Sequence, residues 1–188
     1  VLVAGGYTSG PGYSDTAEIF DPSTGSFSPT GSMSTSRFAP AMAPLPDGRV
    51  LVAGGAFDAS AEIFDPVTGS FSPTGSMGTA RFGSAAAPLP DGRVLVGAGD
   101  SGVGTAISSA EIFDPSTGTF SPTASMNTAR RGTSGAPLPG GRVLVAGGYG
   151  GGVLASNEIY YTAPTLRASG GAFGDEVVDT TSAVRPVT

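Results

Sequence analysis

The sequence of 188 residues contains no cysteine, no histidine and no tryptophan. These absences exclude disulfides, thiolate nucleophiles, zinc sites built on His or Cys, and a His-based catalytic triad within this chain. Lysine is missing too, so all nine basic residues are arginine, and charged residues make up only 13% of the chain. No segment approaches the roughly 18 apolar residues of a membrane-spanning helix. We therefore expect no membrane span, no metal site and no cofactor.

The charge balance narrows the choice of partners. A net charge of −6 without any basic run argues against nucleic acid and against anionic membranes. The chain opens on Val1, inside an apolar run, with neither an initiator Met nor a signal peptide, so we expect a mature product or a fragment. Richness in Thr, Ser and Gly at low charge favours an exported bacterial protein, extracellular or periplasmic.

An internal repeat organises the chain. The phrase Val-Leu-Val opens at positions 1, 50, 94 and 143. The phrase Ala-Glu-Ile-Phe-Asp-Pro opens at 17, 61 and 110, and a variant, Asn-Glu-Ile-Tyr, opens at 157. A third phrase, Thr-Gly-Ser/Thr-Phe-Ser-Pro-Thr, opens at 24, 68 and 117. A fixed order of phrases at such intervals is the signature of a repeat architecture.

Each unit reads as four short strands. In the second unit we expect strands at 37–43, 49–53, 61–64 and 71–74, the second of them apolar and buried. Turn residues separate them: Pro-Asp-Gly at 46–48 and Asp-Pro-Val-Thr-Gly at 65–69. Four strands in each unit of this length predict an all-β fold, a β-propeller with one sheet per repeat.

The units resemble Kelch repeats of the bacterial type and, more distantly, the propeller of galactose-oxidase-like proteins. The resemblance covers about residues 1–160 and rests on motifs in a fixed order. They are the Gly pairs Gly54–Gly55 and Gly147–Gly148, the aromatics Phe20, Phe64 and Phe113 before a turn, the aromatics Phe27, Phe71 and Phe120 where the family usually carries Trp, and Met77 with Arg81. Two departures are the split pair at 97–99 and the segment 160–164, which replaces the Asp-Pro turn.

The repeat divides residues 1–166 into units at about 1–36, 37–80, 81–129 and 130–166. The resemblance implies blades of four antiparallel strands in rings of about six or seven, so about four units predict an incomplete ring. We favour a fragment; two chains sharing one ring, or a small four-bladed ring, are the alternatives. Residues 167–188, Gly-rich and then acidic, are expected to be a mobile tail or a linker, or at 167–173 a degenerate inner strand.

Residues that recur in every unit are best explained by structure. The aromatics are expected to pack between sheets, and Met33, Met77 and Met126 to fill gaps. A carboxylate between apolar neighbours needs a partner, and we expect bidentate Arg–Glu pairs between neighbouring blades. The residues of this set are Arg37, Arg81, Arg130, Glu18, Glu62, Glu111 and Glu158. The alternative is a ring of Arg that lines the channel and binds an anion.

Residues that differ between units are better candidates for binding. The loops after the Gly pairs vary most, and they carry Tyr7, Tyr13, Asp15, Phe57, Asp58, Asp100 and Tyr149. The resemblance implies that these loops share a face with the connection preceding the inner strand. Tyr, Asp and Gly on one rim suit a protein or carbohydrate partner. Plain solvated loops are the alternative.

No catalytic residue is predicted, since paired carboxylates for glycosidase chemistry cannot be assigned from the sequence. We expect a non-catalytic recognition or scaffold module that binds a protein or a carbohydrate through its rim loops. The first alternative is the propeller portion of a larger secreted oxidase or hydrolase with its catalytic residues outside this chain. The second is a structural repeat protein that self-associates through open blade edges.

Overall fold

The computed structural model describes residues 1–10, 12–102, 104–162 and 184–187, the last of these as backbone. The described residues form four antiparallel sheets. The first sheet contains β1 (Leu2–Ala4), β2 (Ala17–Asp21) and β3 (Ser26–Pro29); the second β4 (Ala41–Pro44), β5 (Val50–Ala53), β6 (Ala61–Asp65) and β7 (Ser70–Thr74); the third β8 (Ala85–Pro88), β9 (Val94–Gly97), β10 (Ala110–Asp114) and β11 (Thr119–Thr123); the fourth β12 (Ser134–Leu138), β13 (Arg142–Ala146), β14 (Asn157–Tyr161) and β15 (Val184–Val187). Nowhere in these ranges is there a helix long and apolar enough to cross a membrane.

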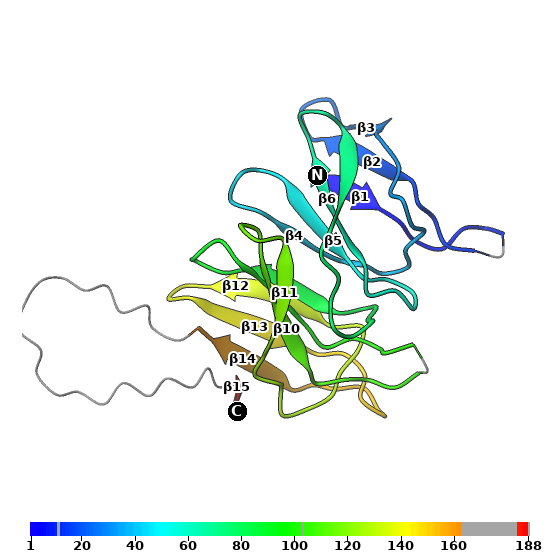
Figure 1. Ribbon diagram of the computed structural model, residues 1–188. Helices are drawn as coiled ribbons and strands as arrows, with labels where there is room; N and C mark the ends of the chain where they lie inside the picture. The colour runs from blue at the N-terminus through cyan, green and yellow to red at the C-terminus, as the bar shows by residue number, and fades with distance from the viewer. Residues whose placement is uncertain (11, 103, 163–183, 188) are drawn as a thin grey trace, which may run out of the picture.

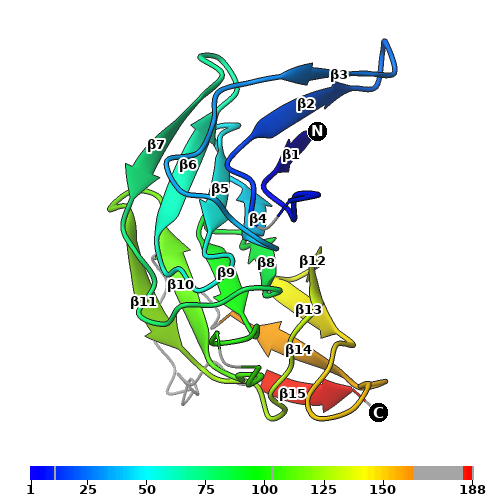
Figure 2. The ribbon, with the colours of Figure 1, turned by 90° about the vertical axis from the view of Figure 1, so that its right-hand side faces the viewer.

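The sheets follow one another in chain order (Figures 1 and 2). In the second, third and fourth sheets the first strand is innermost, and β8 contacts both β4 and β12. The first and fourth sheets stand at opposite ends of this series and do not meet (Figure 1). The expected all-β architecture, an incomplete propeller built from blades of antiparallel strands, is confirmed.

The turns form where the sequence predicts them. In the second sheet the amide of Gly69 donates to the carbonyl of Asp65 at 2.8 Å, and the Asp65 carboxylate accepts from the amide of Val67. Gly69 has a φ of 65°, a left-handed conformation that glycine adopts without strain. The other hairpin of this sheet closes on Gly48, whose φ is 87°. Asp, Pro and Gly at fixed offsets therefore set the register of the second sheet.

Apolar clusters between consecutive sheets hold the blades together. Between the second and third sheets, Leu51 and Met77 pack against Val94, Val96 and Phe113, all of them buried. Equivalent clusters join the first sheet to the second and the third to the fourth. Burial of such side chains contributes about 1.5–3 kcal/mol each, so these contacts dominate the stability of the stack. The predicted burial of the three repeated methionines is confirmed.

The first sheet departs from this pattern. It has three strands, because no strand among the described residues pairs with the inner edge of β1. Each later sheet turns its aromatic face toward the sheet before it, and Phe113 is 0% exposed there. In the first sheet that face is uncovered, so Phe27 is 55% exposed and Val3 is exposed as well. The expectation of core packing is therefore wrong for Phe27.

The observed strands of the second sheet differ from the predicted ones by one residue at several ends, and two larger differences occur. The inner strand of the second sheet begins at Ala41 rather than at residue 37, because Ala39 has a φ of 49° and interrupts the extended backbone. The fourth sheet takes its outer strand from Val184–Val187, which pairs antiparallel with β14. The sequence predicts no strand there. The rest of the expected tail, like the possible strand at 167–173, lies outside the described residues.

Candidate functional site

The three repeated arginines are buried structural groups. Arg37, Arg81 and Arg130 each have 0% of their surface exposed. Each Nη2 forms an ion pair with a buried glutamate of the sheet that follows it: Arg37 with Glu62 at 3.2 Å, Arg81 with Glu111 at 2.8 Å, and Arg130 with Glu158 at 2.9 Å. Complete burial leaves these guanidinium groups inaccessible to a ligand, so the alternative of an anion-binding ring of arginines is not supported.

The pairs differ in detail from the expected bidentate contact. Only Nη2 of Arg130 reaches Glu158, while Nη1 donates to the carbonyls of Gly147 and Ser156 at 2.8 Å each. The Glu158 carboxylate also binds main-chain N–H groups of the connection that precedes the fourth sheet. It accepts from the amide of Asn127 at 2.7 Å and from that of Thr128 at 2.9 Å. The cluster therefore ties each connection to the next sheet and satisfies buried charge with several hydrogen bonds.

These contacts shift the acidity of Glu158. Burial by itself would raise the pKa of the Glu158 carboxyl. The N–H groups of Asn127 and Thr128 and the Arg130 guanidinium outweigh burial and hold the pKa below its ordinary value.

Glu18, the equivalent residue of the first sheet, is exposed and forms no ion pair among the described residues. The expectation of an arginine partner is wrong for Glu18, since no arginine precedes Arg37 in the sequence.

The variable loops and the connections between sheets are joined at one rim of the stack. The residue after each buried arginine bonds through its backbone to the loop after the next Gly pair. The amide of Ala56 donates to the carbonyl of Phe38 at 2.9 Å, that of Asp100 to Phe82 at 2.9 Å, and that of Tyr149 to Arg131 at 2.9 Å. Two kinds of segment, far apart in sequence, therefore form one surface, as the resemblance implies.

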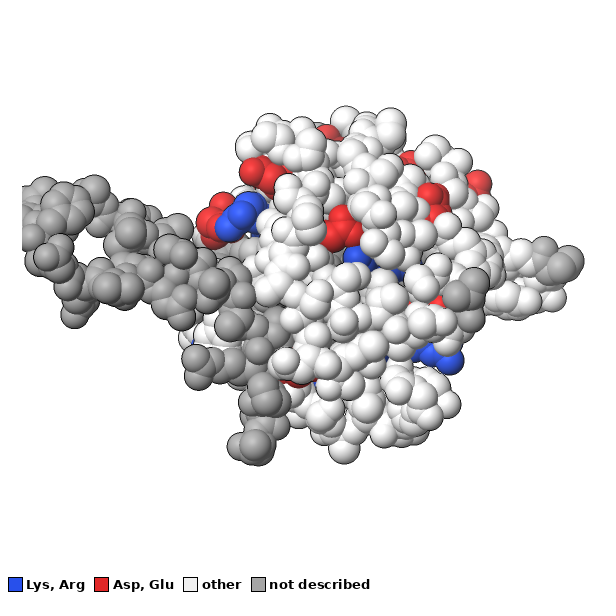
Figure 3. All heavy atoms as spheres, turned by 60° about the horizontal axis from the view of Figure 1, so that its bottom comes forward, with Lys and Arg blue, Asp and Glu red and all other residues white. Residues whose placement is uncertain are grey.

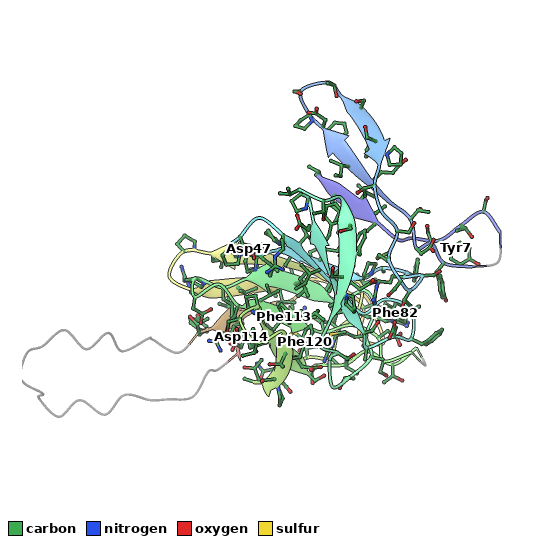
Figure 4. All side chains as sticks on the ribbon, turned by 45° about the horizontal axis from the view of Figure 1, so that its top comes forward. Tyr7, Asp47, Phe82, Phe113, Asp114 and Phe120 are labelled. Carbon is green, nitrogen blue, oxygen red and sulfur yellow. The ribbon has the colours of Figure 1, made fainter. Side chains whose placement is uncertain are left out.

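Aromatic side chains run along this rim. We call this set the aromatic rim: Tyr7, Tyr13, Phe38, Phe57, Phe82 and Tyr149. Tyr13 stacks on Phe38 with ring centroids 5.6 Å apart, and Phe38 leads on to Phe82 at 6.0 Å. Tyr7, Phe57 and Tyr149 are exposed. Figure 4 shows Tyr7 and Phe82 at one end of the sheets, with Asp47 and Asp114 toward the other end.

An ion pair interrupts the aromatic residues. Asp100 is fully buried, and its carboxylate accepts from the amides of Gly102 at 2.8 Å and Gly104 at 3.1 Å and from Nη1 of Arg131. Burial by itself would raise the pKa of Asp100, but the Gly102 amide and the Arg131 guanidinium hold it below its ordinary value. The guanidinium carbon of Arg131 lies 5.2 Å from the Tyr149 ring centroid, within the range of a cation–π contact.

The rim encloses a shallow cavity, which we call the rim hollow. Its volume is about 620 Å³, and it is lined by Phe38, Ala39, Phe82, Gly83, Arg131, Gly132, Gly148 and Tyr149. A ladder of backbone bonds crosses it, since Gly83 donates to Ala39 at 2.9 Å and Gly132 donates to Gly83 at 2.8 Å. A volume of this size falls within the range of known ligand pockets.

Two of the predicted rim residues belong elsewhere. The Asp58 carboxylate accepts from Ser60 and lies 3.7 Å from Arg37, so it belongs to the buried arginine cluster. Asp15 is exposed, and its carbonyl accepts from the Met33 amide without lining the hollow. The other five predicted residues lie on the aromatic rim or, for Asp100, directly behind it.

The sequence prediction misses Phe38, Phe82 and Arg131. They occupy one repeat position, directly after the buried arginine, where two units carry Phe and the third carries Arg. That difference between otherwise matching units is the signal that could have identified the position. This position precedes the inner strand and so lies outside the loops after the Gly pairs, in which the sequence prediction places the binding residues.

The rim offers groups for non-covalent contacts. Its side chains supply apolar rings and guanidinium donors, and no group of three or more acidic residues that could hold a metal ion occurs in the described part of the chain. Uncharged residues cover most of the face drawn in Figure 3, with charged groups scattered between them. Exposed rings beside an anchored arginine are typical of surfaces that bind partners.

Comparison with known proteins identifies Kelch motifs in the chain. The model of the Kelch motif matches residues 1–34 and 81–127. No curated protein matches the chain at a significant level. Kelch repeat domains are generally non-catalytic scaffolds, often used in protein interaction. The chain therefore carries Kelch motifs on an all-β stack of four sheets, an incomplete Kelch-type β-propeller.

Proposed function

We propose that this chain is a non-catalytic recognition module that binds a protein partner across the aromatic rim. The observation that carries the proposal is the continuous row of rings from Tyr13 through Phe38 to Phe82, beside a cavity of about 620 Å³. Aromatic side chains contribute large contact areas at low entropic cost, which is why they dominate binding hot spots.

The proposal separates the rim from the scaffold beneath it. Phe57 and Tyr149 are exposed, so their side chains contribute little to folding, whereas the repeated arginines are fully buried. Rings of the aromatic rim contact one another at one end of the stack, but several keep much of their area exposed, so packing in the core does not account for them. A binding role explains both their exposure and their proximity.

The experiment is a selection from a random dodecapeptide library displayed on phage, run beside an oligosaccharide array. The rim variant is Tyr7→Ala/Phe57→Ala/Tyr149→Ala, and the control is Phe27→Ala, which removes an exposed ring on the first sheet. We expect peptides that bind the wild type and the control, and that bind the rim variant at least about tenfold more weakly. Selected peptides that ignore the rim variant, or binding to oligosaccharides without binding to peptides, would overturn the proposal.

A second candidate is self-association, which the first sheet favours. Its aromatic face is uncovered, with Phe27 and Val3 exposed, and the inner edge of β1 is unpaired among the described residues. The aromatic face of each later sheet packs on the sheet before it. A sheet of a second copy would cover the aromatic face of the first sheet in the same way. Light scattering tests this: a dimer that Phe27→Asp converts to a monomer supports it, and a monomeric wild type contradicts it.

A further inference from the structure

Two neighbouring rim residues break the internal repeat together. The position after the buried arginine carries Phe38, Phe82 and then Arg131. In the loop after each Gly pair, the corresponding position carries Tyr, Ala and Tyr in the first, second and fourth units, but Asp100 in the third. Arg131 and Asp100 form an ion pair with each other. The two departures from the repeat are therefore in direct contact.

The repeat shows that the fold does not need this pair. The connection before the second sheet and the one before the third both carry Phe at the position of Arg131, and in both the carbonyl of that Phe accepts from an amide of the next loop, as the Arg131 carbonyl does. Burying a carboxylate such as Asp100 is unfavourable unless it is fully paired. A pair that the scaffold does not require, placed in the wall of a cavity, indicates a role in binding.

Arg131 is held in place before any ligand arrives. Its side chain is 32% exposed, Nη1 is bound by the buried Asp100, and the guanidinium lies over the Tyr149 ring. Among the described residues, Nη2 and Nε of Arg131 form no hydrogen bond, so both are available as donors on a residue that lines the rim hollow. A donor fixed on two sides loses little freedom on binding, which favours affinity.

The charges of the site disfavour an acidic ligand. Asp100 carries a negative charge directly behind Arg131, so the pair is neutral as a unit. The chain as a whole carries a net charge of −6. A carboxylate on the ligand would be repelled by the net negative charge of the protein, and Asp100 already neutralises the charge of Arg131. An uncharged or basic segment whose carbonyl oxygens accept from Arg131 avoids this repulsion.

The walls of the hollow favour an aromatic group. The ring centroids of Phe38 and Phe82 lie 6.0 Å apart with their planes tilted by 49°, so the two rings touch and form one apolar wall of the hollow. An aromatic ring that packs on these two rings makes edge-to-face or offset contacts, the arrangements that aromatic pairs prefer. Sugars need many hydrogen-bonding groups, and the side chains of Arg131 and Tyr149 are the polar ones in the lining.

We infer that the rim hollow binds an aromatic side chain carried by an uncharged or basic peptide segment, and that Arg131, positioned by Asp100, donates to the carbonyl oxygens of that segment. The inference rests on the proposed function and specifies the ligand of the same rim. Phe38 and Phe82 supply the walls, and Arg131 supplies the polar anchor.

The test uses the random dodecapeptide library on the intact chain. We expect Phe, Tyr or Trp at one position of the selected peptides and no enrichment of Asp or Glu. A synthetic peptide from the selection should bind Phe82→Ala about thirtyfold more weakly. Replacing its aromatic residue by Ala should weaken binding to the wild type to a similar extent.

The variant Asp100→Ala/Arg131→Phe tests the anchor, because it returns both positions to residue types found in the other units. We expect it to keep the thermal midpoint of the wild type and to bind the same peptide about tenfold more weakly. The matched control is Asp47→Ala/Arg49→Ala, which removes an exposed ion pair at the opposite end of the sheets and should leave binding unchanged.

The outcomes separate this inference from the proposed function. Selected peptides that depend on the rim but lack an aromatic residue, or that are rich in Asp and Glu, overturn the inference and leave the proposed function standing. Unchanged affinity in Asp100→Ala/Arg131→Phe overturns the role of Arg131. A large fall in its thermal midpoint does so too, because it would make the pair structural. Peptides that bind equally well to every rim variant overturn both.

Discussion

Arg130 and Arg131 are adjacent in the chain, and each pairs with a buried carboxylate, yet they differ in every other respect. Arg130 is 0% exposed, recurs in three units, and is bound by Glu158 and by two carbonyls of the following sheet. The Arg131 side chain is 32% exposed, has Phe as its counterpart in two units, and lines a cavity. In a repeat protein, residue type alone does not distinguish scaffold from site. Departure from the repeat, taken together with exposure, does.

Mutations of the two arginines should therefore have different consequences. The bonds of Arg130 join a connection to the next sheet, so its loss should lower the stability of the whole stack. The bond of Arg131 joins two rim segments, so its loss should mainly change the structure of the rim surface.

The largest effect is expected for Arg130→Met. The change removes the cation and leaves Glu158 as a buried charge, so the free energy of unfolding should fall by about 3–5 kcal/mol. Urea unfolding followed by circular dichroism measures it. The rim variant Tyr149→Ala is the control and should change little. If Arg130→Met unfolds at the wild-type urea concentration, the buried cluster does not hold the sheets together.

Acid should destabilise the stack through the same cluster. The pKa of Glu158 is lower in the folded protein than in the unfolded chain, so its contribution to stability is present above the unfolded pKa. That contribution is lost as the pH falls through the lower, folded pKa. The thermal midpoint should therefore drop below about pH 4.3, the ordinary value of Glu.

The variant Glu158→Gln isolates this contribution. It should start from a lower midpoint at pH 7, because the ion pair is lost, and its midpoint should fall less steeply in acid. Parallel curves for the variant and the wild type would show that other carboxylates control the acid transition.

The fold was predictable from the sequence to a large extent, because each strand and turn is marked by the same residues in several units. Asp65 and Gly69, for example, form the turn that their types indicate. The start of β4 could not be predicted, since the interruption depends on the positive φ of Ala39, a residue with no preference for it. Strand β15 belongs to no repeat phrase.

The candidate site was predictable only in part. The loop residues Tyr7, Phe57 and Tyr149 stand out because the loops differ between units. Their contacts with Phe38, Phe82 and Arg131 depend on how consecutive sheets are stacked, which a repeat pattern does not specify. The pair of Asp100 with Arg131 joins neighbouring units across 31 residues of sequence, so only the folded stack brings it together.

An intermediate effect is expected for Arg131→Phe alone. The variant leaves Asp100 buried without its cation, although its two amide donors remain, so unfolding should become easier by about 1–3 kcal/mol. Adding Asp100→Ala should restore most of that loss, because the unpaired charge is gone. Differential scanning calorimetry of the two variants measures the difference. Equal midpoints for both would mean that Asp100 does not depend on Arg131.

The smallest effect is expected for the pair of Asp91 with Arg93, which recurs in the sequence but lies in the open. The two groups are 2.7 Å apart, with side chains 32% and 44% exposed. Water and salt screen such pairs, so a double-mutant cycle with Asp91→Ala and Arg93→Ala should give a coupling of only about 0.2–1 kcal/mol, which 1 M salt should abolish. A coupling as large as that of Arg130 with Glu158 would contradict the distinction drawn here, because it would mean that recurrence alone, without burial, makes an ion pair structural.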